Sequence, residues 1–328
     1  MVWLHNARII AIFAVVILHV AAGVVIGKPV GSADWWIGNV YDSFARWCVP
    51  VFVMISGALL LEPEKKEGLK EFYAKRLSRI LVPVMFWSVF YVFWGWLQGQ
   101  PADPVHLAKK LAAGKPHYHM WFLYMIMVLY IFTPFFKRLI ASSSRQEMTV
   151  FASVALVCVA INKILGVGES KLFINYFLSY VPYFFIGYLI KSSERTFKTS
   201  TLAVVIAASA ALTAFGCYLL ARRGNLDAGM YFYNYLSVTV IPMSIGMMYW
   251  LKKWIKPLVG DRTVQLSALT LGVYLIHPVF LETFISAFDA YRMDYPVVGI
   301  PFTVMVVFAL SLASAWVINK TPYLKKVI

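Results

Sequence analysis

Long apolar runs separated by short charged or turn-rich segments set the pattern of this sequence. Ile9–Gly27, Thr201–Ala221 and Pro301–Ile318 contain no Asp, Glu, Lys or Arg. A helix needs about 17–25 predominantly apolar residues to cross a bilayer, and each of these runs is long enough. Along the whole chain, the same pattern predicts about ten transmembrane helices. Their expected ranges are 7–27, 41–61, 80–97, 119–138, 148–166, 174–191, 201–221, 231–250, 266–287 and 296–318.

Composition and connection lengths favour an all-α, polytopic membrane protein. Hydrophobic residues make up 61% of the chain and its mean hydropathy is +0.72, whereas a soluble domain is about 45–50% apolar. The connections are too short for a soluble domain of ordinary size, so we expect a single membrane domain over residues 1–328. The first apolar run is longer than the roughly 7–15 residues of a signal-peptide core, which predicts a retained helix. Three cysteines lie within apolar runs and are expected to be small core residues, namely Cys48, Cys158 and Cys217.

The distribution of positive charge predicts the orientation of the chain, whose formal net charge is +15 at pH 7. With the N-terminus inside, twenty lysines and arginines fall on the cytoplasmic side and nine on the other. Because cytoplasmic loops of membrane proteins carry an excess of these residues, both termini are expected in the cytoplasm. The basic residues are spread over six inner segments, which favours contact with anionic membrane lipids and argues against a nucleic-acid partner.

Two histidines at membrane depth are the first candidates for chemistry, because ionisable side chains within a span are costly unless they pair or line a wet cavity. His19 follows Arg8 by eleven residues. At 100° and 1.5 Å per residue, both side chains share one helix face and lie about 16.5 Å apart along the axis. His277, within Tyr274–Pro278, is expected at about the same depth in the ninth span. The alternative for each histidine is a structural bond to a neighbouring helix.

Arg76 and Arg79 stand at the inner end of the third span, three residues apart and therefore on one helix face. Two guanidinium groups in that position can bind phosphates bidentately. The alternative is that they contribute only to the positive-inside signal. Ser56 and Gly57 lie near the same surface, where small residues usually let helices approach closely.

A second polar group is expected near the outer surface. Asp42 and Arg46 are four residues apart and able to pair, and His119 and Trp121 open the fourth span. Arg46 lies about 7.5 Å below the surface, so snorkelling to water is the alternative to a binding role. Trp121 also fits an interfacial aromatic belt. His117 and His119 lack the carboxylate or cysteine companions of a zinc site, so no metal is expected.

Together these motifs resemble the acyltransferase 3 family of multispan membrane O-acyltransferases over most of the chain. The arginine, ten intervening residues and histidine of Arg8–His19 carry the resemblance most strongly. Asn6 stands where many members have an acidic residue, which puts a salt bridge from that position in doubt. The supporting stretches are Val49–Gly57, Arg76–Pro83, His119–Leu123 and Tyr274–Pro278.

The resemblance implies transfer of an acyl group, commonly acetyl from cytoplasmic acetyl-CoA, to a hydroxyl of a cell-envelope sugar or glycan in the inner membrane of a bacterium. It implies catalysis by His19, Arg8 and His277. It implies acyl-CoA binding by Arg8, Arg76, Arg79 and Ser56. It implies acceptor binding by Arg46, Asp42, His119, Trp121 and Tyr274.

His19 is expected to act as a general base, since an ordinary imidazole pKa of about 6.5 makes neutral histidine available at pH 7. A covalent acyl-histidine intermediate is the alternative. Acceptor identity, acyl chain length and oligomeric state stay open at this point. The competing class is a transporter or flippase for a sugar or lipid-linked intermediate, which about ten spans with mid-membrane histidines also suit. Acceptor-dependent release of the CoA thiol distinguishes the enzyme from the transporter.

Overall fold

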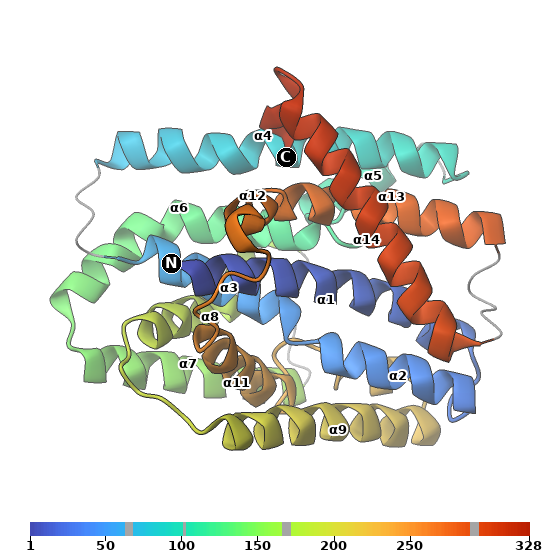
Figure 1. Ribbon diagram of the computed structural model, residues 1–328, viewed down its shortest axis with the longest axis horizontal. Coiled ribbons are helices and arrows are strands. Elements are labelled where there is room, and N and C mark those ends of the chain that lie inside the picture. The colour runs from blue at the N-terminus through green and yellow to red at the C-terminus, as the bar shows by residue number, and fades with distance from the viewer. Residues whose placement is uncertain (63–67, 101–102, 166–171, 289–294) are drawn as a thin grey trace. The chain divides into compact units, whose positions relative to one another are not determined.

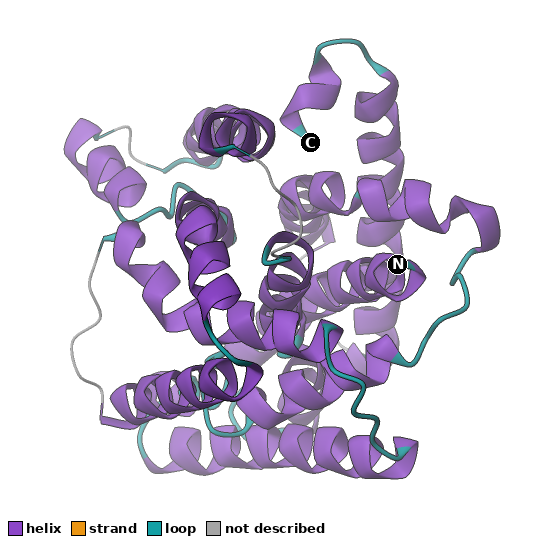
Figure 2. Cartoon of the chain, turned by 90° about the vertical axis from the view of Figure 1, so that its left-hand side faces the viewer, coloured by secondary structure: helices purple, strands orange, loops and turns teal. Residues whose placement is uncertain are grey.

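Helices joined by loops make up the part of the chain that the computed structural model describes, and no strand occurs there (Figures 1 and 2). Helix accounts for 81% of it. The described ranges are 1–62, 68–100, 103–165, 172–288 and 295–328. Four of the basic residues counted for the orientation lie outside these ranges, namely Lys65, Lys66, Lys171 and Arg292.

Eight helical spans within the described residues are long and apolar enough to cross a membrane. They are α1 (Val2–Gly27), α2 (Ala33–Ala45) continued by α3 (Cys48–Leu60), α4 (Leu69–Leu97), α6 (Trp121–Ser142), α7 (Arg145–Leu165), α9 (Thr199–Arg223), α13 (Thr270–Phe288) and α14 (Pro296–Lys320). Two other expected spans contain shorter helices, α8 (Tyr176–Lys191) with 16 residues and α11 (Val240–Lys252) with 13. The all-α, polytopic class is therefore confirmed, whereas the count of ten and the cytoplasmic termini stay predictions.

The remaining helical segments are short connections, and local sequence sets where they and their neighbours begin. Ser32 caps α2 because its hydroxyl accepts the Trp35 N–H at 3.2 Å. Asp103 caps α5 by accepting from Val105 and His106. The short segments are α5 (Pro104–Ala112), η1 (Phe173–Asn175), α10 (Leu226–Gly229), η2 (Gly260–Arg262), α12 (Thr263–Ala268) and η4 (Leu324–Val327).

The contacts divide the chain into two compact units. Unit 1 comprises residues 1–55 and 190–318, and unit 2 comprises 56–189 and 319–328. In unit 1, α1 packs against α2, α11, α12 and α13, while α9 packs against α2, α10 and α11. In unit 2, α4 packs against α6 and η4. The single membrane domain expected over the whole chain stays a prediction.

Lys252, one of the basic residues counted for the orientation, also binds backbone carbonyls at the end of α8. Its Nζ donates to the carbonyls of Ile190 at 2.6 Å, Lys191 at 3.3 Å and Ser193 at 2.5 Å. Ile190 and Lys191 end α8 and Ser193 follows it, and at a helix C-terminus the backbone acceptors lack helical partners and a cation is favourable. Lys252 therefore caps the C-terminal end of α8.

The cysteines agree only in part with the expectation that all three are core residues. Cys48 and Cys217 are buried, whereas Cys158 is exposed on α7. The expectation for Cys158 is wrong because an apolar run does not show which face of its helix packs inside the protein.

Candidate functional site

The two mid-span histidines of unit 1 are in direct contact. His277 Nε2 on α13 lies 3.0 Å from His19 Nδ1 on α1, and the ring centroids are 4.9 Å apart with planes inclined by 31°. His277 is fully buried and His19 is partly exposed. The structure thus brings together two residues that are 258 positions apart in the chain.

Pro278 explains why the buried His277 ring is held in place. A proline has no N–H to give to the carbonyl four residues earlier, so the Tyr274 carbonyl loses its helical partner. His277 Nδ1 lies 2.7 Å from that oxygen and 3.2 Å from the carbonyl of Val273. The Tyr274 ring centroid is 6.1 Å from the His277 ring. The imidazole therefore replaces the backbone hydrogen bond that the proline removes.

The start of α1 is tied to a distant part of unit 1 by Asn6, which is fully buried. Its amide Nδ2 donates to the carbonyls of Trp254 at 3.0 Å and Lys256 at 2.8 Å, and its Oδ1 accepts from the Leu258 N–H at 3.0 Å. A carboxylate has no hydrogen to donate to two carbonyls. The amide where the family pattern has an acidic residue is therefore the group that this packing requires.

Arg8 keeps the predicted relation to His19, because α1 runs without a break from Val2 to Gly27. The eleven-residue separation places the two residues about 16.5 Å apart along the helix axis. Arg8 is partly exposed, near the end of α1 that Asn6 attaches to residues 254–258. The role expected for Arg8 at the inner surface stays a prediction.

A buried ion pair stands where α2 ends. Pro50 cannot donate to the carbonyl of Arg46, and the helix is interrupted at Arg46 and Trp47 before α3 begins. Arg46 Nη2 lies 2.6 Å from Asp42 Oδ2, with side-chain exposures of 12% and 0%. The expected pairing of Asp42 and Arg46 is thus present, and little of the Arg46 side chain is exposed.

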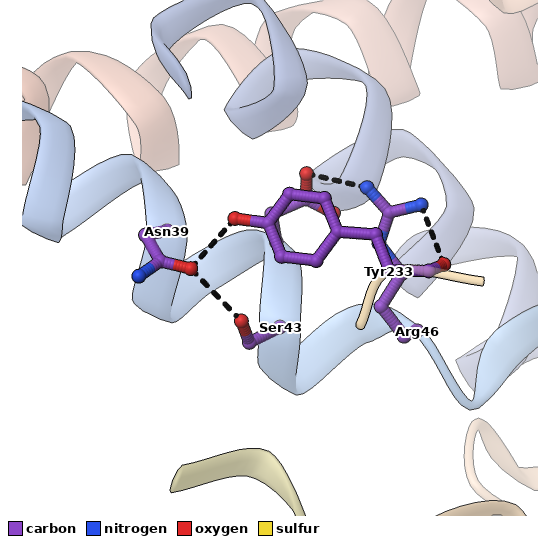
Figure 3. A network of polar contacts seen from close by, with 5 residues as sticks. Asn39, Ser43, Arg46 and Tyr233 are labelled. Carbon is purple, nitrogen blue, oxygen red and sulfur yellow. Dashed lines mark hydrogen bonds and ion pairs between the residues drawn. The ribbon is translucent and has the colours of Figure 1, made fainter. Parts of the chain in front are cut away.

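Tyr233 joins this pair to a hydrogen-bond network (Figure 3). Arg46 Nη1 donates to the Tyr233 carbonyl at 3.2 Å, and its guanidinium lies 4.2 Å from the Tyr233 ring centroid. The Tyr233 hydroxyl donates to Asn39 Oδ1 at 2.6 Å, which also accepts from Ser43 at 3.1 Å. Asn39 Nδ2 in turn donates to the Ala214 carbonyl of α9 at 2.9 Å. The network connects α2 with α9 and the segment after α10.

Two atoms of the ion pair keep unused hydrogen-bonding capacity. Asp42 Oδ1 and Arg46 Nε are buried and have no hydrogen-bond partner among the described residues. Buried polar atoms are nearly always bonded to protein or to ordered water. An unused acceptor and an unused donor within one ion pair suit water or a hydroxyl group, which both donates and accepts.

His117 and His119 belong to an aromatic cluster within unit 2. His117 Nδ1 and His119 Nδ1 are 3.0 Å apart, and Tyr91 stacks on His117 with a centroid distance of 4.3 Å. His119 is 2% exposed and Tyr91 is 1% exposed. Trp121 is next to Tyr180, with ring centroids 5.7 Å apart. No group of three or more metal-ligating side chains occurs in the described ranges.

The candidate donor-binding residues on α4 and α3 also belong to unit 2. Arg76 lies with its guanidinium 5.4 Å from the Phe72 ring centroid, and Arg79 is exposed. Ser56 accepts a long hydrogen bond of 3.4 Å from Tyr130. A Cβ on Gly57 would meet the Phe184 carbonyl oxygen at 1.8 Å. Gly57 therefore permits close approach of α3 and α8, which is the structural explanation that the sequence suggested for small residues.

Sequence reasoning missed several members of these groups. Asn39 and Ser43 share a face of α2 with Asp42 and Arg46, so a search for polar residues spaced three or four apart would have found them. Tyr233 gives no such signal, because it is 194 positions from Asn39. The structure places Arg8, His19, Asp42, Arg46, Tyr274 and His277 in unit 1 and Ser56, Arg76, Arg79, His119 and Trp121 in unit 2.

Comparisons with known proteins show a family match over nearly the whole chain. The family model described as an acyltransferase domain, that of the acyltransferase 3 family, matches residues 1–320. Glucans biosynthesis protein C of Salmonella typhi is 23% identical over 336 aligned residues, which cover 90% of this chain and 84% of the relative. The same-named proteins of Salmonella typhimurium strain LT2 and Salmonella agona strain SL483 align with the same identity and coverage. No solved structure gives a significant match.

Proposed function

Because the chain belongs to the acyltransferase 3 family, we propose that it transfers an acyl group, acetyl in the simplest case, from acyl-CoA to a hydroxyl of a cell-envelope sugar or glycan. The observation that carries the proposal is the 3.0 Å contact between His19 and His277 inside two apolar helices. Ionisable groups at membrane depth mark functional sites by default. An imidazole there supplies the base that acyl transfer to a hydroxyl requires.

The proposed reaction uses His19 as the general base. The acceptor oxygen attacks the thioester carbonyl carbon while His19 takes the hydroxyl proton, and a new C–O bond forms. The C–S bond then breaks, and the CoA sulfur leaves as a thiolate that takes up the proton to become the thiol. Base catalysis of this kind typically contributes about 10²–10⁴ in rate.

Two sets of side chains are suited to binding the proposed donor and acceptor. Arg76 and Arg79 are suited to the phosphates of CoA, because guanidinium groups bind phosphate bidentately. Asp42 Oδ1 and Arg46 Nε offer an acceptor and a donor to a hydroxylated ligand. The name of the Salmonella relatives refers to glucans biosynthesis, which supports a glycan as the acceptor. Their bacterial origin supports the inner membrane as the location.

The test combines donor binding and turnover on the detergent-purified protein. Acetyl-CoA binding is measured by calorimetry, and release of the CoA thiol is followed with and without oligosaccharide acceptors such as short glucans. We expect His19→Ala to lower turnover about 10²–10⁴-fold while acetyl-CoA binding is retained. Arg76→Ala is expected to weaken binding instead.

Lys75→Ala is the matched control for Arg76→Ala, since it removes the same charge one residue away. Lys75 is 53% exposed and pairs with Glu71, so we expect its removal to leave acetyl-CoA affinity unchanged. A folded wild-type protein that neither binds acetyl-CoA nor releases thiol would overturn the proposal. Uptake of a labelled sugar without thiol release would point to transport.

A further inference from the structure

The hydrogen bonds around His277 determine which of its ring nitrogens carries the proton. Its Nδ1 faces the Tyr274 carbonyl at 2.7 Å and the Val273 carbonyl at 3.2 Å. A carbonyl oxygen only accepts hydrogen bonds, so Nδ1 must be the donor. A neutral imidazole has a single N–H, which makes His277 Nε2 an acceptor.

The same hydrogen-bond argument then fixes the position of the proton on His19. His277 Nε2 is 3.0 Å from His19 Nδ1, and two unprotonated nitrogens at that distance would repel each other. His19 therefore carries its hydrogen on Nδ1 and donates it to His277. The second ring nitrogen, Nε2 of His19, is then the one without a proton.

We propose that His277 is a positioning residue that fixes His19 in the Nδ1–H tautomer, so that Nε2 of His19 is the nitrogen that takes the proton of the acceptor hydroxyl. This inference rests on the proposed function for its catalytic consequence. It extends that function by assigning the reacting nitrogen and a role for a fully buried histidine. It also assigns a role to Pro278. Because Pro278 has no N–H, the Tyr274 carbonyl is available to accept the hydrogen bond from His277 that holds the imidazole in place.

The arrangement suits a base that must take and return a proton. When His19 Nε2 accepts the proton, its Nδ1–H continues to donate to His277 Nε2, and His277 Nδ1–H continues to donate to Tyr274. Neither hydrogen bond has to break during the transfer. The imidazolium that forms keeps an acceptor in contact with its Nδ1–H, which stabilises its charge in the membrane interior.

Two amide substitutions separate the two bonds that His277 makes. In His277→Gln the side-chain amide reaches the position of Nε2 and can accept from His19, whereas in His277→Asn it reaches only the position of Nδ1 and can donate to Tyr274. We expect His277→Asn to lower kcat about 10²-fold or more with little change in acetyl-CoA affinity, because loss of the correct tautomer costs up to about 10⁴ in a comparable catalytic triad. His277→Gln should recover at least tenfold over His277→Asn.

The matched control is His106→Gln, in which an exposed histidine of α5 is replaced, and its turnover should equal that of wild type. Thermal unfolding of every variant establishes that each is folded. Equal activities of His277→Gln and His277→Asn, or wild-type activity of His277→Asn, would overturn the proposed role.

Nitrogen NMR of histidine-labelled protein tests the tautomer without any assay of activity. Ring nitrogens with and without a proton have well-separated chemical shifts, and the His19 signals are identified by their loss in His19→Ala. We expect His19 to be protonated at Nδ1 in wild type and to acquire the Nε2–H form in His277→Asn. An Nε2–H tautomer of His19 in wild type refutes the inference. A correct tautomer in a protein without acyl transfer contradicts the proposed function and leaves the assignment of the proton intact.

Discussion

The ion pair of Asp42 and Arg46 should behave as a buried unit whose partners cannot be removed singly. The perturbations are Asp42→Leu, Arg46→Met and the double variant. At 2.6 Å separation and an effective dielectric constant of about 20, the attraction between the two charges is about 6 kcal/mol. Much of this offsets the cost of taking both groups out of water.

Removing one partner leaves the other charge buried, which typically costs about 3–5 kcal/mol of unfolding free energy. The cost of Arg46→Met should lie at the upper end of this range, because Arg46 also donates to the Tyr233 carbonyl and its guanidinium lies over the Tyr233 ring. The double variant leaves no buried charge and should lose only about 1–2 kcal/mol. The coupling energy of the cycle is therefore expected to exceed about 3 kcal/mol.

The assay is reversible unfolding in mixed micelles with increasing SDS, followed by circular dichroism. Ser43→Ala serves as a control within the same network, since it removes one neutral hydrogen bond worth about 0.5–1.5 kcal/mol. Single variants that each cost less than about 1 kcal/mol would show that water reaches the pair. A double variant as unstable as the sum of the singles would show that the two charges do not interact.

Three further outcomes follow from particular contacts. Asn6→Asp should cost about 2–4 kcal/mol in the same unfolding assay, since two carbonyls lose their donor; unchanged stability would contradict the amide's role. Gly57→Ala should cost at least 1–3 kcal/mol, because the new Cβ meets the Phe184 carbonyl at 1.8 Å, while Gly68→Ala meets nothing within 4 Å and should cost far less. Acetyl-CoA at about 100 times its Kd should stabilise the wild type by about 2.7 kcal/mol, and the effect should be lost at the same concentration in Arg76→Ala; equal stabilisation of both would remove Arg76 from the donor site.

The sequence predicted most of the membrane architecture because long apolar runs have few alternatives in a bilayer. It also placed His19 and His277 at one depth, since each lies a fixed number of residues from the inner end of its span. It overestimated the span at 231–250, where α11 begins only at Val240. In that segment the side chains of Asn234 and Ser237 accept backbone N–H groups of Leu236 and Val240, and such local bonds compete with a helix.

Partners that lie far apart in the chain could not be predicted. Asp42 and Arg46 share a helix, so their pairing follows from spacing alone. The Tyr233 ring and carbonyl that complete their environment come from a different part of unit 1, and no periodicity relates them to α2. Asn6 is similar, because its departure from the family pattern was visible whereas the three backbone groups that require an amide were not.

The contact between His19 and His277 also determines when the histidine pair can form during synthesis of the chain. Ribosomes add about 5–20 residues per second, so the 258 positions between the two histidines correspond to roughly 13–50 seconds of synthesis. During that interval α1 is already made while the residue that orients His19 does not yet exist. A nascent chain therefore holds its base without a defined tautomer, and the pair assembles only when α13 reaches the first helix.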